Sequence, residues 1–165
     1  RAKEERNLIS EKKKREVIEQ LLLQNYNKYY RLACSYVHND SDAGDIVQNG
    51  AYKAILHSHK LKNIRHAETW LYRIMLNEVF ANYRDRESVS LEEVVYEQGK
   101  EDTYENVDLQ KAINTLEKKD RAVIVLRYFE EMKLEEIAMV LEENLSTVKS
   151  RLYRRMKKLR LEMEE

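Results

Sequence analysis

The sequence contains no proline, only three glycines and one cysteine among its 165 residues. Strands and tight turns usually need more proline and glycine, so this scarcity favours helices joined by short polar connections. The single cysteine, Cys34, excludes an internal disulfide, and its apolar neighbours favour a small buried residue over a nucleophile. No apolar run approaches the roughly 18 residues of a membrane span, and no secretory signal is visible. We therefore expect a cytoplasmic protein without direct membrane insertion.

Residues that carry out chemistry are equally scarce. The soft metal ligands are Cys34 and four histidines, and none of them has the paired spacing that is typical of a metal site. The sequence has no glycine-rich phosphate loop and no nucleophile motif. We therefore expect no metal, no cofactor and no enzymatic activity.

The periodicity of the apolar residues divides the chain into four segments. Residues 1–19 are charged and non-periodic, which indicates a solvated tail or frayed helix more than a binding arm. Residues 20–86 repeat apolar positions at spacings of three and four, as helices do. Residues 87–107 contain seven acids, one lysine and no sustained period, and the helical period returns over 108–165. The prediction is an all-α protein, two small helical domains joined by an acidic flexible linker.

The most unusual stretch is NLSTVKSRLYRRMKKLR, residues 144–160. It has seven lysines and arginines and no acid, in a chain whose net charge is zero. On a helix, an apolar stripe faces a core and the basic residues lie on the other side; the stripe consists of Val148, Leu152, Met156 and Leu159. Asn144 or Ser146 is expected to cap the start of this helix.

A second short helix, predicted around 134–141, precedes the basic helix by a four-residue turn. Two helices joined by a tight turn, with Ser, Thr, Lys and Arg near the start of the second, describe a helix-turn-helix. Such side chains bind DNA phosphates and base edges. The alternative is a solvated basic face on a helical bundle, without a partner.

Three stretches together resemble one protein family. They are DAGDIVQNGAYKAI (42–55), ETWLYRIMLNEVFANYRDR (68–86) and LEEIAMVLEENLSTVKSRLYRRMKKLR (134–160). In this order they resemble a bacterial RNA polymerase sigma factor of the extracytoplasmic-function group. The resemblance implies a region 2-like domain over 20–86 and a region 4-like domain over 108–165. It also implies promoter-specific transcription initiation, with control by an anti-sigma factor that in some members is membrane-anchored.

The resemblance also assigns roles to residues. The first stretch would dock on the clamp helices of the beta-prime subunit of polymerase core, through Asp45, Gln48 and Asn49. The loop over 57–66 and the next helix would open the −10 promoter element and hold a flipped base, through Lys62, Asn63, Arg73 and Asn77. The basic helix would enter the major groove at the −35 element, through Thr147, Lys149, Ser150, Arg151, Tyr153 and Arg154.

The first stretch also departs from the family pattern, chiefly at Gly44, Asn49 and Gly50. Two glycines inside a helix cost about 1 kcal/mol each relative to alanine, so we expect a less regular helix or a weaker contact with polymerase core than the family pattern gives. We expect Ser41 or Asp42 to cap this helix.

Two other functions fit parts of the sequence. An ordinary helix-turn-helix regulator with an N-terminal helical interaction domain would bind its DNA duplex without polymerase. A helical interaction module with no nucleic-acid role would show no salt-dependent DNA binding.

Overall fold

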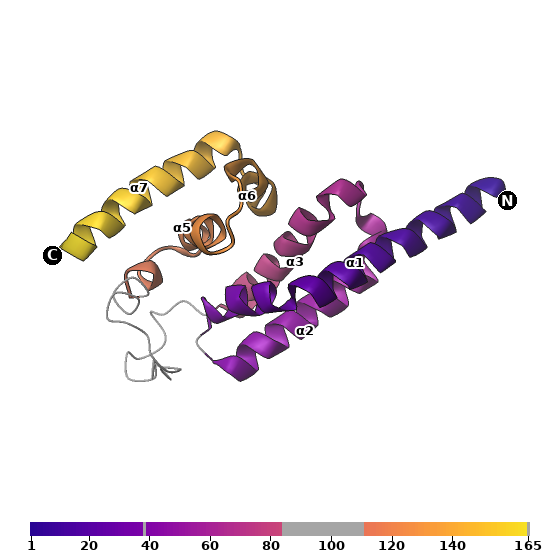
Figure 1. Ribbon diagram of the computed structural model, residues 1–165, viewed down its shortest axis with the longest axis horizontal. Coiled ribbons are helices and arrows are strands. Elements are labelled where there is room, and N and C mark those ends of the chain that lie inside the picture. Colours follow the sequence, from indigo (N-terminus) through magenta and orange to yellow (C-terminus); the bar gives the residue numbers. More distant parts are fainter. Residues whose placement is uncertain (38, 84–110, 165) are drawn as a thin grey trace. The chain divides into compact units, whose positions relative to one another are not determined.

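The structure, a computed structural model, describes residues 1–37, 39–83 and 111–164, with residues 161–164 described by their backbone alone. Within these residues every regular element is helical, which confirms the all-α prediction. The chain divides into two compact units, Arg1–Tyr83 and Arg84–Glu165, and each is described by itself (Figure 1). The acidic linker predicted over 87–107 lies outside the described residues.

The first unit is built from three helices that pack on one another in pairs: α1 (Ala2–Cys34), α2 (Asp40–Leu56) and α3 (Ala67–Asn82). Two short 3-10 turns, Ser58–Lys60 and Ile64–His66, connect α2 to α3. The helices bury a shared set of aliphatic and aromatic side chains, which includes Ile18, Tyr29, Leu32, Ile46, Val47, Leu71, Tyr72, Met75 and Leu76. Apolar spacing of three and four along each helix therefore produces one core.

Helix α1 extends through the segment that was expected to be a solvated tail or a frayed helix. It begins at Ala2, and Ile18 is fully buried, so the packed part of the helix includes a residue of the segment 1–19. Residues 1–13 are nevertheless exposed, as their charge suggests. The helix is kinked at Asn25, whose backbone angles (φ −112°, ψ 15°) are not helical.

Helix α2 begins earlier than expected and is unbroken. The side chain of Asn39 accepts hydrogen bonds from the backbone N–H groups of Ser41 (2.9 Å) and Asp42 (3.3 Å), so Asn39 is the cap and the predicted caps are wrong. The helix continues through Gly44 and Gly50. A Cβ atom on Gly50 would lie 2.5 Å from the Met75 Sδ of α3, whereas one on Gly44 would meet nothing within 4 Å. Gly50 therefore allows close packing of α2 and α3.

The second unit contains shorter elements. Residues 111–114 are helical, and α5 (Lys118–Ile124) continues into a π-helical turn, Val125–Phe129. Helix α6 (Leu134–Leu141) and helix α7 (Leu145–Glu164) follow, and α7 packs on both α5 and α6. The predicted stripe of α7 faces this core: Val148, Leu152 and Leu159 are buried and Met156 is half-buried.

The α6–turn–α7 pair forms the helix-turn-helix that the sequence predicts. Glu142 ends α6 in the left-handed region (φ 56°), and its backbone N–H bonds back to the last turn of the helix. A left-handed residue at this position reverses the chain within a few residues. In the part of the chain that the structure describes, no helix is both long enough and apolar enough to cross a membrane.

Candidate functional site

The start of α7 is fixed by Asn144. Its side-chain oxygen accepts hydrogen bonds from the backbone N–H of Thr147 (3.1 Å) and from the hydroxyl groups of Thr147 (2.5 Å) and Ser146 (3.3 Å). Asn144 is thus the cap of the helix, one of the two residues that the sequence offered. Thr147 is half-buried and its hydroxyl is used in this cap, so Thr147 orders the helix start as well as lying beside the exposed face.

The outer side of α7 carries a basic and polar surface. Four of the six residues expected to contact the −35 element are exposed there, and they are Lys149, Ser150, Tyr153 and Arg154. The Tyr153 side chain is 66% exposed although it is aromatic. Since the apolar stripe is buried on the opposite side, these four side chains are presented to solvent by a helix that is anchored behind them.

Arg151 differs from its neighbours, because its side chain is turned inward. Its Nε and Nη2 donate to the two carboxylate oxygens of Glu143 (2.9 and 2.8 Å), and its Nη1 donates to Asp120 Oδ1 (2.8 Å). The hydrogen bonds to Glu143 raise the pKa of Arg151 above its ordinary value. On the helix, Arg151 lies at the edge of the buried stripe, and its guanidinium is held by Glu143 and Asp120.

Asp120 of α5 is the centre of this ion cluster. Its carboxylate is 3% exposed and also accepts a hydrogen bond from Arg155 Nε at 2.6 Å. Glu117 and Lys119 complete the rim of the cluster, at 3.4 Å from Arg151 and 3.6 Å from Glu143 respectively. A polar cavity of about 440 Å³ opens beside the cluster and reaches the exposed side chains of Ser150 and Arg154.

The candidate residues of α2 form a second exposed surface. Asp45, Gln48 and Asn49 are all exposed, and spacings of three and four place them on one side of the helix. The same side continues into Tyr52 and Leu56, which are 67% and 53% exposed although both are large and apolar. Sequence reasoning missed these two residues. The sequence could have identified them, because each is a large apolar residue at a position of α2 that falls outside the periodic set of buried positions.

The third surface combines the 57–66 loop with α3. Lys62 and Asn63 are exposed between the two 3-10 turns, and Asn63 Oδ1 accepts a hydrogen bond from the backbone N–H of Arg65 (3.0 Å). On α3, Asn77 is exposed and Arg73, four residues earlier, is half-buried. The second 3-10 turn contacts α3 directly, so the four residues belong to two adjoining elements.

Comparison with known families accounts for both units. The sequence model described as Sigma-70 region 2 matches residues 21–89, and the one described as Sigma-70, region 4 matches residues 106–159. RNA polymerase sigma factor SigV of Bacillus subtilis is 38% identical over 82% of this chain and 84% of its own length. The chain belongs to the extracytoplasmic-function group of the sigma-70 family.

Other proteins that are similar to this sigma factor support the same family assignment. RNA polymerase sigma-E factor of Streptomyces coelicolor is 33% identical over 81% of this chain and 78% of its own length. Two solved structures share the fold at 24% identity and a TM-score of 0.71. One is the sigma factor RpoE in complex with the anti-sigma factor NepR from Bartonella quintana, covering 88% of this chain and 96% of that one. The other is CnrH in complex with the cytosolic domain of CnrY, covering 89% and 87%.

Within the region 2 unit of this sigma factor, an ion pair between an exposed lysine and a buried glutamate joins α2 to α3. Lys53 Nζ donates to Glu78 Oε2 at 2.5 Å, and the Glu78 side chain is 9% exposed. Lys53 follows Asn49 by four residues on α2, and Glu78 follows Asn77 on α3. The pair therefore ties the candidate polymerase surface to the helix that carries two candidate −10 residues.

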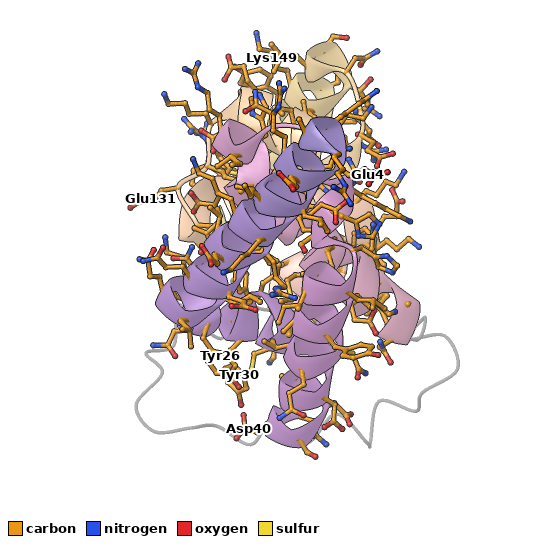
Figure 2. The ribbon with its side chains drawn as sticks, turned by 90° about the vertical axis from the view of Figure 1, so that its right-hand side faces the viewer. Glu4, Tyr26, Tyr30, Asp40, Glu131 and Lys149 are labelled. Atoms are coloured by element: carbon orange, nitrogen blue, oxygen red, sulfur yellow. The ribbon has the colours of Figure 1, made fainter. Side chains whose placement is uncertain are left out.

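A pair of tyrosines on α1 contacts the first residue of α2. The Tyr30 hydroxyl donates to Asp40 Oδ1 at 2.9 Å, and Tyr26 stacks on Tyr30 with ring centroids 6.3 Å apart (Figure 2). The hydrogen bond to Asp40 raises the pKa of Tyr30, and burial raises the pKa of the neighbouring Cys34 thiol. Both groups are therefore neutral at pH 7, and Cys34 is not an activated nucleophile.

No metal centre accompanies these surfaces in the described ranges 1–37, 39–83 and 111–164. No three His, Cys, Asp or Glu side chains there are grouped as ligands of an ion.

Proposed function

We propose that this sigma factor directs polymerase core to promoters through three separate surfaces: α2 for the core, the 57–66 loop with α3 for the −10 element, and α7 for the −35 element. The observation that carries the proposal is the division of α7, within a region 4 unit, into a buried apolar side and an exposed basic side. A helix anchored in this way presents its outer residues to the major groove, as helix-turn-helix proteins do.

At the −35 element, Lys149, Ser150, Tyr153 and Arg154 carry the contacts. Arginine binds the O6 and N7 atoms of guanine through two hydrogen bonds, and serine donates to or accepts from several base edges. The exposed ring of Tyr153 packs on a thymine methyl group or on the sugar backbone. Thr147 supports the contact by holding the helix start against Asn144.

At the −10 element, Lys62, Asn63, Arg73 and Asn77 carry the contacts. Extruding a base costs a few kcal/mol of stacking, which a protein recovers by holding the single strand. Lys62 and Arg73 supply positive charge for the backbone of that strand. The Asn63 oxygen is used in its local turn, so its amide N–H groups face the DNA.

On the polymerase side, Asp45, Gln48 and Asn49 bind the clamp helices of the beta-prime subunit. Tyr52 and Leu56 extend this contact, because an interface usually has an apolar centre with a polar rim and draws much of its affinity from aromatic anchors. The exposure of both side chains in the free chain supports this assignment.

A protein partner controls the sigma factor. Both solved structures named above are complexes, one of a sigma factor with an anti-sigma factor and the other of CnrH with the cytosolic domain of CnrY, and their fold matches this chain over most of its length. The partner here is an anti-sigma factor, soluble or membrane-anchored, that covers the exposed surfaces. The sigma factor acts in the cytoplasm, where polymerase and promoter DNA are found, and it catalyses no reaction of its own.

Transcription from purified components tests the proposal. The full chain and polymerase core are mixed with a promoter library, and we expect discrete transcripts that neither component gives alone. The matched variant is Gln48→Ala together with Asn49→Ala, which removes two exposed side chains of α2 and should abolish binding to core without loss of helicity. A chain that fails to bind core, yet binds a duplex tightly by itself, would instead be an ordinary helix-turn-helix regulator.

A further inference from the structure

Two arginines on the inner side of α7 hold one buried carboxylate of α5. Arg151 and Arg155 are four residues apart, so they leave the helix on the same side. Asp120 Oδ1 accepts a hydrogen bond from Arg151 at 2.8 Å, and Asp120 Oδ2 accepts one from Arg155 at 2.6 Å. Because this carboxylate is almost completely buried, both of its oxygens are committed to the two guanidinium groups.

Glu143 fixes the same helix from the other direction. It lies in the turn between α6 and α7, and its two oxygens accept two parallel hydrogen bonds from Arg151. A paired contact of this kind holds the planar guanidinium in one orientation. Arg151 is thus held from the turn and from α5 at once, while Asp120 holds Arg155 one helical turn further along.

The apolar stripe alone would not define the rotation of α7 so closely, because burial of apolar surface has no preferred direction. Hydrogen bonds do have one, since they require distances of about 2.7–3.2 Å. The tip of a side chain lies roughly 6 Å from its helix axis, so a rotation of about 20° moves that tip by roughly 2 Å. A shift of this size breaks a hydrogen bond between Arg154 and a base edge.

We propose that Asp120 and Glu143 are positioning residues for −35 recognition, which set the rotation of α7 through Arg151 and Arg155. This inference rests on the proposed function, in which the outer side of α7 reads DNA. Arg151 then serves as an internal anchor in place of the DNA contact that the sequence suggested. The charges support this role, because the buried carboxylate of Asp120 and the half-buried one of Glu143 face two guanidinium groups at hydrogen-bond distance.

The test compares two variants that remove one charge each. Asp120→Asn keeps the shape of the buried side chain, and Glu117→Gln makes the same change at the rim, where the carboxylate is 57% exposed. Each full-length variant is combined with polymerase core. Initiation is measured on competing promoters that share one −10 sequence and differ by single bases at −35. Circular dichroism establishes that each variant is folded at the assay temperature.

For Asp120→Asn we expect the preference for the best −35 sequence to fall roughly tenfold at several positions together, since a good base contact is worth about that factor. Glu117→Gln should keep the wild-type preferences. A residue that only stabilised the unit would change the amount of active holoenzyme, which scales every promoter equally and leaves the ratios unchanged. Wild-type ratios in folded Asp120→Asn would therefore overturn the positioning role.

Glu143→Gln decides the same question if Asp120→Asn does not fold. It loosens the anchor at the turn and leaves both bonds to Asp120 in place, so it should relax several −35 positions, and unchanged ratios would overturn the proposal. A wild-type holoenzyme without any −35 preference would refute the proposed function of α7 itself. That result is distinct from a wild type with a clear preference that the variants retain.

Discussion

The two units of this sigma factor reach a fixed geometry by different means. The region 2 unit packs helices of 33, 17 and 16 residues, whereas the region 4 unit attaches helices of 7 and 8 residues to a helix of 20. Isolated helices shorter than about 12–15 residues are marginal in water, so α5 and α6 depend on tertiary contacts for their existence. In the region 4 unit those contacts include a buried ion cluster with directional hydrogen bonds.

The comparison distinguishes apolar burial, which stabilises a unit, from directional contacts, which define how a helix is oriented. In the region 2 unit, three long helices share an extensive aliphatic and aromatic core, and among the described residues we find one ion pair between α2 and α3, whose lysine is exposed. In the region 4 unit, the helix that is proposed to read DNA meets its support through Asp120 and Glu143 as well as through its apolar stripe. A helix that must place several side chains on base edges gains from contacts that define its rotation.

The largest expected effect tests the apolar side of this comparison. Leu71 of α3 is fully buried, and Leu71→Ala should lower the free energy of unfolding by about 2–5 kcal/mol through lost burial and a residual cavity. The measurement is urea unfolding of the full chain followed by circular dichroism. Leu23→Ala is the control, because that leucine is 83% exposed and its loss should change stability little. Equal effects of both changes would mean that α1 and α3 do not pack as described.

A smaller effect is expected on the outer side of α7. Arg154→Ala should cost about 1–3 kcal/mol of discrimination at one −35 position, because it removes a paired contact with a guanine. Lys157→Ala, one turn further on, should weaken all promoters alike and reduce the slope of affinity against salt by about one. Binding of the holoenzyme to −35 variants at two salt concentrations separates the two cases. If the variant with both Arg154→Ala and Lys149→Ala keeps the wild-type affinity and the wild-type preference among −35 sequences, the basic side of α7 is only a solvated face.

The smallest effect compares the two glycines of α2. Gly50→Ala should lower stability by about 1 kcal/mol, because the new Cβ presses on Met75 and this overpacking exceeds the gain in helix propensity. Gly44→Ala should raise stability by up to about 1 kcal/mol, since its Cβ meets nothing. Thermal unfolding of the two variants side by side gives the result. A stabilising Gly50→Ala would indicate that α2 and α3 lie further apart.

Periodicity in the sequence predicted most of the fold, and the failures were local. The bounds of α6 and the buried stripe of α7 followed directly from apolar spacing. The cap of α2 was placed two or three residues late, because several residues of HNDSD are able to cap and spacing does not choose among them. The α1 segment before residue 20 was expected to be a solvated tail or a frayed helix, and the sequence did not choose between them, since charge hides a helix whose buried side begins at Ile18.

The candidate surfaces were predictable from the family resemblance to the level of the helix, and less so to the level of the residue. Arg151 illustrates the limit. The sequence shows one more arginine in a basic stretch, but its partners Asp120 and Glu143 lie 31 and 8 residues away along the chain. Long-range ion pairs leave no periodic signal. Tyr52 and Leu56 were missed for a related reason, because a large apolar side chain is usually assigned to the core.

Chemical probing of a promoter bound by the holoenzyme tests the central claim most directly. The probe reports protected bases at −35 and unpaired thymines at −10, with and without polymerase core. With core, we expect protection at −35 together with reactive thymines at −10, and neither signal from the chain alone at the same concentration. The −10 signal should be lost in the Lys62→Ala, Arg73→Ala double variant while the −35 protection remains. Equal protection by the chain without core, and paired thymines throughout, would contradict the assignment of the three surfaces.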